Sequence, residues 1–224
     1  MQIIISDILP RDEALALGEV LARSGWIDGN ATSGPAAALA KRNRQLPETS
    51  PAAAAARARI EAALAQNVTF LSAALPRALF PPLFNAYGPG EGFGAHVDNA
   101  IRRTPAGEML RTDLSATLFL SEDYDGGALN IHGPSGAVSH TLPAGHMVLY
   151  PSTSLHNVTP VSRGSRIACF FWLQSLVRDH DAREMLFDLD QAIQTLTAEH
   201  GGTDATVLRL TKVYHNLVRH WAEC

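Results

Sequence analysis

Short apolar runs separated by turn sequences fill residues 78–175 and restrict the folds that this chain can adopt. The runs are PLFNAY, LSATLFL, ALNIHG, AVSHTL, HMVLYP and RIACFFWL. The sequences between them, which include YGPGEG, DYDGG, GPSG, LPAG and SRGS, are rich in the Gly, Pro, Asp and Ser residues of tight turns. Many short strands at near-regular spacing predict a β-sandwich or barrel, a class that includes the double-sheet jelly roll.

Helical spacing of apolar residues replaces this pattern on both sides of the β region. Residues 50–67 begin with Ser50 as a predicted N-cap, followed by Pro51 in the first helical position and a run of alanines. Residues 9–25, and two amphipathic stretches after residue 180, also carry apolar side chains at helical spacing. Each of these segments is therefore expected to form a helix.

These patterns together predict a mainly β protein with helical flanks, of the α+β class. We expect a first unit over residues 1–178, whose β core occupies about 78–178, and a helical extension over 179–224 that packs on this core. A short opening strand is expected at residues 2–6.

The composition is that of a globular domain. Apolar residues make up 46% of the 224 residues and charged residues 18%, with a net charge of −4, so nothing favours nucleic acid as a partner. The first residues lack the features of a signal peptide and no apolar run is long enough to span a membrane, so we expect a cytoplasmic protein. Of the two cysteines, Cys169 is expected in the core and Cys224 at an exposed end, without a disulfide framework.

The segment GFGAHVDNAI places a histidine and an aspartate two residues apart, at His96 and Asp98. On a strand, residues i and i+2 point to the same face, so both side chains would reach one spot. The small residues Gly92, Gly94 and Ala95 leave room beside them for another element or for a ligand. An isolated H-x-D is a weak signal, and a metal site needs a third ligand.

His156 is the best candidate for that ligand. Of the histidines at positions 132, 140, 146 and 156, it alone is followed ten residues later by a cation, Arg166, at the head of an apolar strand. Two histidines and one carboxylate on one face of an octahedral metal are typical of non-haem Fe(II) enzymes that activate oxygen. A dicarboxylate such as 2-oxoglutarate would fill two open positions of the metal, and its far carboxylate suits the planar fork of an arginine.

At these residues the sequence resembles the Fe(II)/2-oxoglutarate-dependent dioxygenases of the prolyl-4-hydroxylase-like superfamily, and more closely the bacterial PKHD-type hydroxylases. The stretches NAYGPGEGFGAHVDNAI, RTDLSATLFLSEDYDGGALNI and VLYPSTSLHNVTPVSRGSRIACFFWLQSLVRD carry the resemblance, which is most specific at 85–178. It implies a double-stranded β-helix core, Fe(II) held by His96, Asp98 and His156, and 2-oxoglutarate anchored by Arg166. It also implies L-ascorbate as the reductant.

Further residues are candidates for binding the co-substrate. Relatives often place a tyrosine near Tyr87, where its hydroxyl bonds the co-substrate, although a buried structural tyrosine is equally expected. Trp172 shares a strand face with Arg166, so it either walls the iron pocket or packs in the core. We expect Ser115 and Thr117 on an ordinary polar face, with a hydroxyl for the co-substrate as the alternative. Gly126 and Gly127 are expected in a hairpin turn.

The polar segment 100–113 directly follows the H-x-D residues and contains three arginines, Arg102, Arg103 and Arg111. Its position beside the metal predicts a mobile lid over the substrate, and its arginines would meet an acidic or phosphate-bearing group. The alternative is a solvated loop.

We therefore predict an enzyme that hydroxylates a C–H bond with release of succinate and CO2. Its expected partners are O2 and a small-molecule or peptide substrate, and the apolar stripes of the last two helices suit either a homodimer or packing on the core. A non-catalytic sensor of iron and 2-oxoglutarate is the alternative, and a zinc hydrolase is a third hypothesis that leaves Arg166 without a role.

Overall fold

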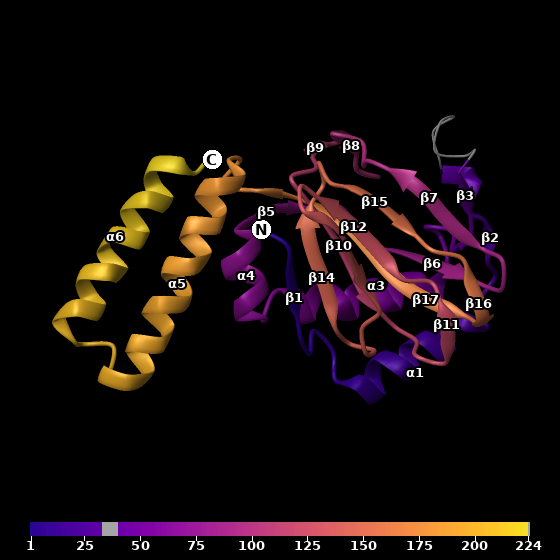
Figure 1. Ribbon diagram of the computed structural model, residues 1–224, viewed down its shortest axis with the longest axis horizontal. Helices are drawn as coiled ribbons and strands as arrows, with labels where there is room; N and C mark the ends of the chain where they lie inside the picture. The colour runs from indigo at the N-terminus through magenta and orange to yellow at the C-terminus, as the bar shows by residue number, and fades with distance from the viewer. Residues whose placement is uncertain (33–39, 224) are drawn as a thin grey trace.

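The computed structural model describes residues 1–32 and 40–223, so the prediction for Cys224 lies outside the described residues. Two antiparallel sheets form the β core (Figure 1). The larger sheet contains, in order, β1 (Ile3–Ile5), β14 (Met147–Pro151), β10 (Leu114–Phe119), β17 (Arg166–Ser175), β6 (Leu83–Tyr87), β4 (Arg44–Gln45) and β2 (Ile27–Asp28), with β5 (Pro76–Leu79) also paired to β17. The predicted opening strand is confirmed by β1.

The smaller sheet has five strands and faces the larger one. Its order is β13 (Gly136–His140), β12 (Leu129–Gly133), β15 (Leu155–Val158), β7 (Gly92–His96) and β3 (Lys41–Arg42). Two further strand pairs lie beside the sheets: β11 (Tyr124–Gly126) with β16 (Val161–Gly164), and β8 (Ile101–Arg103) with β9 (Met109–Arg111). Short strands therefore occupy the region where the alternation of apolar runs and turns predicted them.

Three helices cover the outer face of the larger sheet. They are α1 (Arg11–Ala22), α3 (Pro51–Leu64) and α4 (Val68–Ala74). A short 3-10 turn, η1 (Gly29–Thr32), lies between α1 and α3 in the chain. Leu21, Ile60 and Phe70 of the helices share one buried cluster with Phe171 of β17. Cys169 belongs to the same cluster and is fully buried, which confirms its expected place in the core.

Side-chain caps set where the helices begin. The Ala53 N–H donates to Ser50 Oγ at 3.4 Å, so the predicted N-cap of α3 is confirmed. The Phe70 N–H donates to Asn67 Oδ1 at 2.8 Å and starts α4, a short helix that lies beyond the predicted stretch 50–67. Asn67 thus caps α4, three residues after α3 ends at Leu64.

The C-terminal helices α5 (His180–His200) and α6 (Ala205–Trp221) form a hairpin that stands beside the β core (Figure 1). Helix α5 contacts α4, and α6 packs along α5. The chain returns to the core after α6, because the Glu223 N–H donates to the Leu176 carbonyl at 2.7 Å. Among residues 1–32 and 40–223, no helix is both long and apolar enough to cross a membrane.

The two faces of strand β10 have different neighbours: one packs on the helix layer and the other faces the smaller sheet. All six of its residues are buried, although successive side chains point to opposite faces. Leu114, Ala116 and Leu118 face the helix layer, where they join the large apolar cluster. Ser115 and Thr117 therefore point inward, toward the space between the two sheets.

Candidate metal centre

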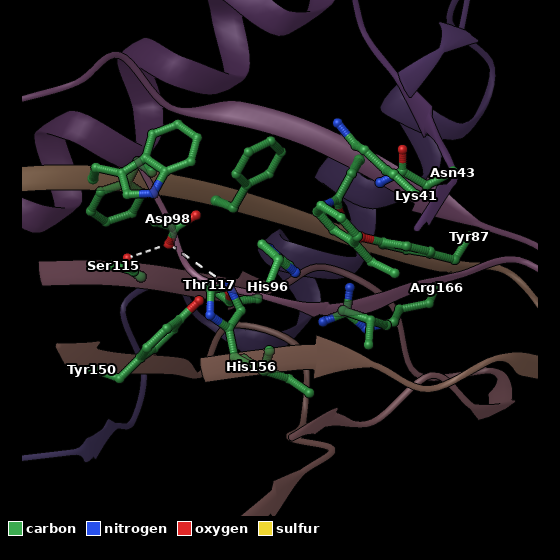
Figure 2. A pocket seen from close by; sticks show the side chains of 18 residues that line it. Lys41, Asn43, Tyr87, His96, Asp98, Ser115, Thr117, Tyr150, His156 and Arg166 are labelled. Atoms are coloured by element: carbon green, nitrogen blue, oxygen red, sulfur yellow. Dashed lines mark hydrogen bonds and ion pairs between the residues drawn. The ribbon is translucent and has the colours of Figure 1, made fainter. Parts of the chain in front are cut away.

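A cavity lies between the two sheets (Figure 2), lined by both apolar and polar side chains. Strands of both sheets line it. The residues that line it are Lys41, Asn43, Asn85, Tyr87, Phe93, His96, Asp98, Ser115, Ala116, Thr117, Leu129, Tyr150, His156, Val158, Arg166, Phe170, Phe171 and Trp172. The predicted site residues thus meet around one enclosed space.

The structure brings the three predicted metal ligands together at one end of this cavity. His96 ends β7 and stands opposite His156 of β15 in the antiparallel pairing. Asp98 lies two residues beyond β7, and one ligand atom from each of the three residues falls within 4.8 Å of the others. Asp98 Oδ2 and His156 Nε2 are 3.8 Å apart (Figure 2). Two imidazoles and one carboxylate at this spacing match the donor set of a non-haem iron site.

Backbone carbonyls orient both imidazole rings. The Nδ1 atom of His96 lies 2.8 Å from the Gly94 carbonyl, and that of His156 lies 3.0 Å from the Ser154 carbonyl. If each Nδ1 carries the proton, the lone pair is on Nε2, which faces the other ligands. Burial, and after it the nearby His156, lower the pKa of His96 to about 4. The His96 ring is therefore neutral near pH 7, as metal binding requires.

Ser115 orients the carboxylate. Its hydroxyl donates to Asp98 Oδ2 at 2.7 Å, and Ser152 Oγ lies 2.7 Å from Ser115 Oγ. The expectation of an ordinary polar face was wrong for Ser115 and Thr117, which are 2% and 6% exposed. Alternation along β10 correctly put both on one face, but the helix layer covers the other face, so the hydroxyls turn into the cavity.

Replacing Ser115 by alanine is expected to weaken divalent metal binding about 10- to 100-fold, because the Asp98 carboxylate loses the hydrogen bond that orients it. Anaerobic titration with Fe(II) measures the change. Ser162→Ala, which removes an exposed hydroxyl, is the matched control. Equal affinities for the Ser115→Ala protein and this control would show that the hydrogen bond does not support the metal.

Arg166 lies in the same cavity and has no carboxylate partner among residues 1–32 and 40–223. It is 1% exposed and stands opposite Tyr87 in the pairing of β17 with β6. Its Cζ is 5.3 Å from the Tyr87 ring centre and 5.1 Å from that of Phe119. Its Nε and Nη2 atoms have no hydrogen-bond partner among the described residues. A buried guanidinium without an anion is costly, so this environment fits a ligand carboxylate at Arg166.

Gly127 provides the space in which Arg166 lies. A Cβ atom on Gly127 would fall 2.9 Å from Arg166 Cδ and 2.9 Å from Val161 Cγ2, and its φ is +62°. The prediction of a hairpin turn at Gly126 and Gly127 was wrong, because β11 pairs with β16 rather than with β12. The two glycines instead carry the chain from one strand pair to the smaller sheet.

A Gly127→Ala change is expected to destabilise the protein by about 1–3 kcal/mol through backbone strain and crowding, and to weaken 2-oxoglutarate binding by displacing Arg166. Thermal unfolding and ligand titration measure the two effects. Gly136→Ala is the control, since Gly136 also has positive φ (+115°) but meets nothing within 4 Å. The role in the site is excluded if both variants bind the ligand like the parent protein.

Tyr87 and Trp172 both line the cavity, as their candidate roles require. Tyr87 is 1% exposed, and Asn85 Nδ2 lies 3.3 Å from its hydroxyl oxygen. Burial raises the pKa of Tyr87, so the hydroxyl keeps its proton. Trp172 also packs edge-on against Phe80, at 5.5 Å between ring centres. Trp172 is therefore both a wall of the pocket and a packed core residue, so both interpretations hold.

The small residues before His96 make room for neighbouring chain segments. A Cβ atom on Gly92 would fall 2.9 Å from the Val158 carbonyl oxygen, and one on Gly94 would fall 3.0 Å from the Ala40 Cβ. Of the two alternatives left by the sequence, close approach of another element thus accounts for both glycines. Pairing of β7 with β3 and β15 is what brings those segments near.

The segment 100–113 forms the hairpin β8–β9 and separates its three arginines. Arg111 is held by Asp113, at 2.7 Å, and by Glu223 of the C-terminal tail, also at 2.7 Å. Arg103 is exposed. Arg102 stacks on Trp172, with its Cζ 3.7 Å from the ring centre. Residues 100–113 are therefore not a solvated loop. That this hairpin moves as a lid over the substrate stays a prediction.

Lys41 lines the cavity and was not predicted. It belongs to the stretch KRNR at residues 41–44, where neither spacing nor a motif separates a buried lysine from a solvated one. Pairing of β3 with β7 brings it opposite Phe93, whose ring stacks on His96 at 3.6 Å between centres. A long-range strand contact is what places Lys41 here.

Comparison with known proteins agrees with this geometry. The 2OG-Fe(II) oxygenase superfamily matches residues 82–174, and the PKHD-type hydroxylase C-terminal domain matches residues 180–223. A PKHD-type hydroxylase of Burkholderia thailandensis is 55% identical over 226 aligned positions that cover 100% of both chains.

Solved structures show the same fold. A prolyl-4-hydroxylase of Pseudomonas putida aligns with a TM-score of 0.51 at 25% identity, over 78% of this chain and 92% of that one. A prolyl hydroxylase of Trichoplax adhaerens, in complex with a hypoxia inducible factor oxygen degradation domain peptide fragment, aligns with a TM-score of 0.55 at 17% identity, over 77% and 82% of the two chains. The predicted α+β jelly-roll fold is thereby confirmed. By its full-length identity to the Burkholderia protein, this chain belongs to the PKHD-type hydroxylases, a group of Fe(II)- and 2-oxoglutarate-dependent dioxygenases.

Proposed function

We propose that His96, Asp98 and His156 hold Fe(II), that Arg166 binds the far carboxylate of 2-oxoglutarate, and that the enzyme hydroxylates a C–H bond of a small molecule or peptide. One observation carries this assignment: two imidazoles and a carboxylate converge within 4.8 Å in a cavity that also contains a buried arginine, two of whose nitrogen atoms find no partner in the described part of the chain. That pair of features suits a divalent metal and a dicarboxylate together.

Each polar side chain has a separable task in this proposal. Bound Fe(II) supplies the oxidising chemistry, which consumes O2 and 2-oxoglutarate, releases succinate and CO2, and inserts one oxygen atom into the substrate. His96 and His156 present Nε2, because their Nδ1 atoms are engaged by backbone carbonyls. Ser115 holds the Asp98 carboxylate in one orientation. Arg166 supplies parallel N–H donors that fix the co-substrate in one pose.

Tyr87 and Trp172 are proposed to shape the co-substrate side of the cavity. The Tyr87 hydroxyl keeps its proton and offers it to a carboxylate next to Arg166, to which Tyr87 is paired across β6 and β17. Trp172, Phe170 and Val158 contribute apolar walls that exclude water from the oxidation. Asp98 is the one carboxylate among the residues described as lining the cavity, and it is assigned to the metal.

Three further expectations accompany this proposal. L-ascorbate is the expected reductant of inactive iron, from the resemblance to the family, and the cytoplasm is the expected location. A homodimer is expected through the C-terminal helices, since α6 exposes Leu208 and Val213. The two-unit organisation, a dioxygenase unit over residues 1–178 and an extension over 179–224, is proposed from the same reasoning.

The experiment that tests the function uses protein purified without oxygen, loaded with Fe(II) and 2-oxoglutarate, and exposed to labelled O2 with a metabolite extract. We expect succinate and one product to gain a single labelled oxygen atom each, and metal analysis to find iron. The identity of the labelled product gives the substrate. Binding of iron and 2-oxoglutarate without any consumption of oxygen would contradict the proposal.

A further inference from the structure

Two cations near the metal triad are not used by the metal or by the co-substrate. The first is Lys41, which is 7% exposed and lines the cavity. Its ammonium donates to the Gly29 carbonyl at 2.8 Å and to Gln45 Oε1 at 3.1 Å. Both acceptors are neutral, so among the described residues the ammonium meets no carboxylate within hydrogen-bond distance, and one of its three N–H donors is left for a ligand.

The second cation is Arg102 of the hairpin β8–β9, which lies against Trp172, a residue of the cavity wall. Its guanidinium stacks on Trp172 at 3.7 Å and lies 5.2 Å from the Phe80 ring centre. Stacking on aromatic faces holds the plane of the guanidinium and leaves its edge for an anion. The ion pairs and hydrogen bonds found among residues 1–32 and 40–223 include none with a carboxylate for Arg102 or Lys41.

The two cations lie close enough to affect each other. Burial, and after it the positive charge of Arg102, lower the pKa of Lys41 to about 8, so the ammonium stays mainly charged at pH 7. The attraction of Asp28 opposes this shift only in part. A buried lysine next to an arginine is an electrostatic cost in the substrate-free enzyme that an anion would remove.

A count of formal charge in the loaded site leads to the same conclusion. Divalent iron, Asp98 and dianionic 2-oxoglutarate carry a joint charge of minus one, with both imidazoles neutral. Arg166 and Lys41 line the cavity, and Arg102 stacks on Trp172 of its wall, so these cations leave a surplus of two positive charges. Among the described residues, only the exposed carboxylates of Asp28 and Glu48 oppose this surplus. Charges withdrawn from water require counter-charges.

We infer that the substrate of this hydroxylase carries a carboxylate, which binds between Lys41 and Arg102 while the C–H bond to be oxidised lies next to His96, Asp98 and His156. The inference rests on the proposed function, since it assumes iron at the triad and 2-oxoglutarate at Arg166. The carboxylate belongs either to a small organic acid or to an acidic residue of a peptide. In both cases the same two cations recognise it.

The test measures binding without turnover. The full chain is loaded with Mn(II), which replaces iron as a paramagnetic probe, and with 2-oxoglutarate. Its ligands are N-acetyl amino acids as free acids, the corresponding amides, and blocked tripeptides with each amino acid at the centre. Relaxation of ligand protons by Mn(II) reports which compounds bind beside the metal, and titrations give their affinities. The tripeptides distinguish an acidic side chain from a free small acid.

We expect the compounds that bind beside the metal to carry a carboxylate, and Arg102→Gln to weaken their binding about tenfold. Arg103→Gln, which removes the neighbouring exposed charge, is the matched control and leaves binding within about twofold. Lys41→Gln is expected to act like Arg102→Gln. Lys41 is buried, so the Lys41→Gln protein risks misfolding. The binding measured with Arg102→Gln, at a half-buried residue, is therefore the decisive test.

Three results would overturn the inference: neutral compounds that bind as well as acids, no compound that binds beside the metal, or acids that bind the Arg102→Gln protein like the parent. Weaker 2-oxoglutarate binding in Arg102→Gln would assign the arginine to the co-substrate instead. Two other measurements test the proposed function separately. It fails if an Arg166→Met protein binds 2-oxoglutarate like the parent, or if the iron-loaded parent does not consume oxygen in the presence of 2-oxoglutarate.

Discussion

An Asp98→Ala protein is expected to bind Fe(II) at least about 100-fold more weakly than the parent and to lose succinate formation at ordinary iron concentrations, because removing a metal ligand costs more than removing a residue that orients one. Two neutral imidazoles would remain, and they attract a divalent cation less than a site with a carboxylate does. Anaerobic Fe(II) titration and succinate formation measure the two losses.

The fold is expected to survive this substitution. Asp98 lies beyond the end of β7, and its described hydrogen bond is the one from Ser115, which retains Ser152 as a partner. Asp123→Ala, which removes an exposed carboxylate, is the control and should leave iron binding unchanged. Parent-like iron affinity and turnover in a folded Asp98→Ala protein would mean that the metal lies elsewhere.

An Arg166→Met protein is expected to bind 2-oxoglutarate about 100-fold more weakly or worse, since the charged, bidentate partner of its far carboxylate is lost. Titration of the metal-loaded protein measures this affinity. Arg163→Met is the control, because Arg163 is exposed and pairs with Asp123 and Asp125 at the surface.

The Arg166→Met substitution is expected to weaken 2-oxoglutarate binding but not the stability of the ligand-free fold. Without ligand, Arg166 is a buried charge, and two of its nitrogen atoms have no partner among the residues that the structure describes. A methionine of similar length should therefore leave the free energy of unfolding unchanged or raise it. Thermal unfolding should show a transition at or above that of the parent, together with a lost stabilisation by 2-oxoglutarate. A strongly destabilised Arg166→Met protein would instead make Arg166 a structural residue.

Sequence spacing was sufficient where the relevant physics is local. The two-residue spacing of His96 and Asp98 predicts a shared location for any strand that ends there, and the structure has that strand as β7. Ser50 followed by Pro51 predicts the start of α3, because an N-cap bonds an amide only three residues away. The ten-residue interval from His156 to Arg166 selected one histidine of four, although spacing alone does not reveal that both face one cavity.

The surroundings of the other site residues depended on which segments of the chain cover each face of a strand. Ser115 and Thr117 were placed on the right face of their strand but were assigned to solvent, since a strand does not encode that helices cover its opposite face. Gly127 resembles a turn glycine until Arg166 is seen beside it. The three arginines of residues 100–113 are equivalent in sequence, yet one meets Trp172, one meets Asp113 and Glu223, and one meets solvent.

The sequence by itself therefore determined the class of fold, the start of α3 and the candidate donor set of His96, Asp98 and His156. These follow from strand periodicity, turn residues and capping, which act between residues close in the chain. Only the tertiary structure decided the residues that support and surround that centre, among them Ser115, Gly127, Lys41 and Arg102. Their positions follow from pairing and packing between distant segments, where burial and the need to neutralise charge set the outcome.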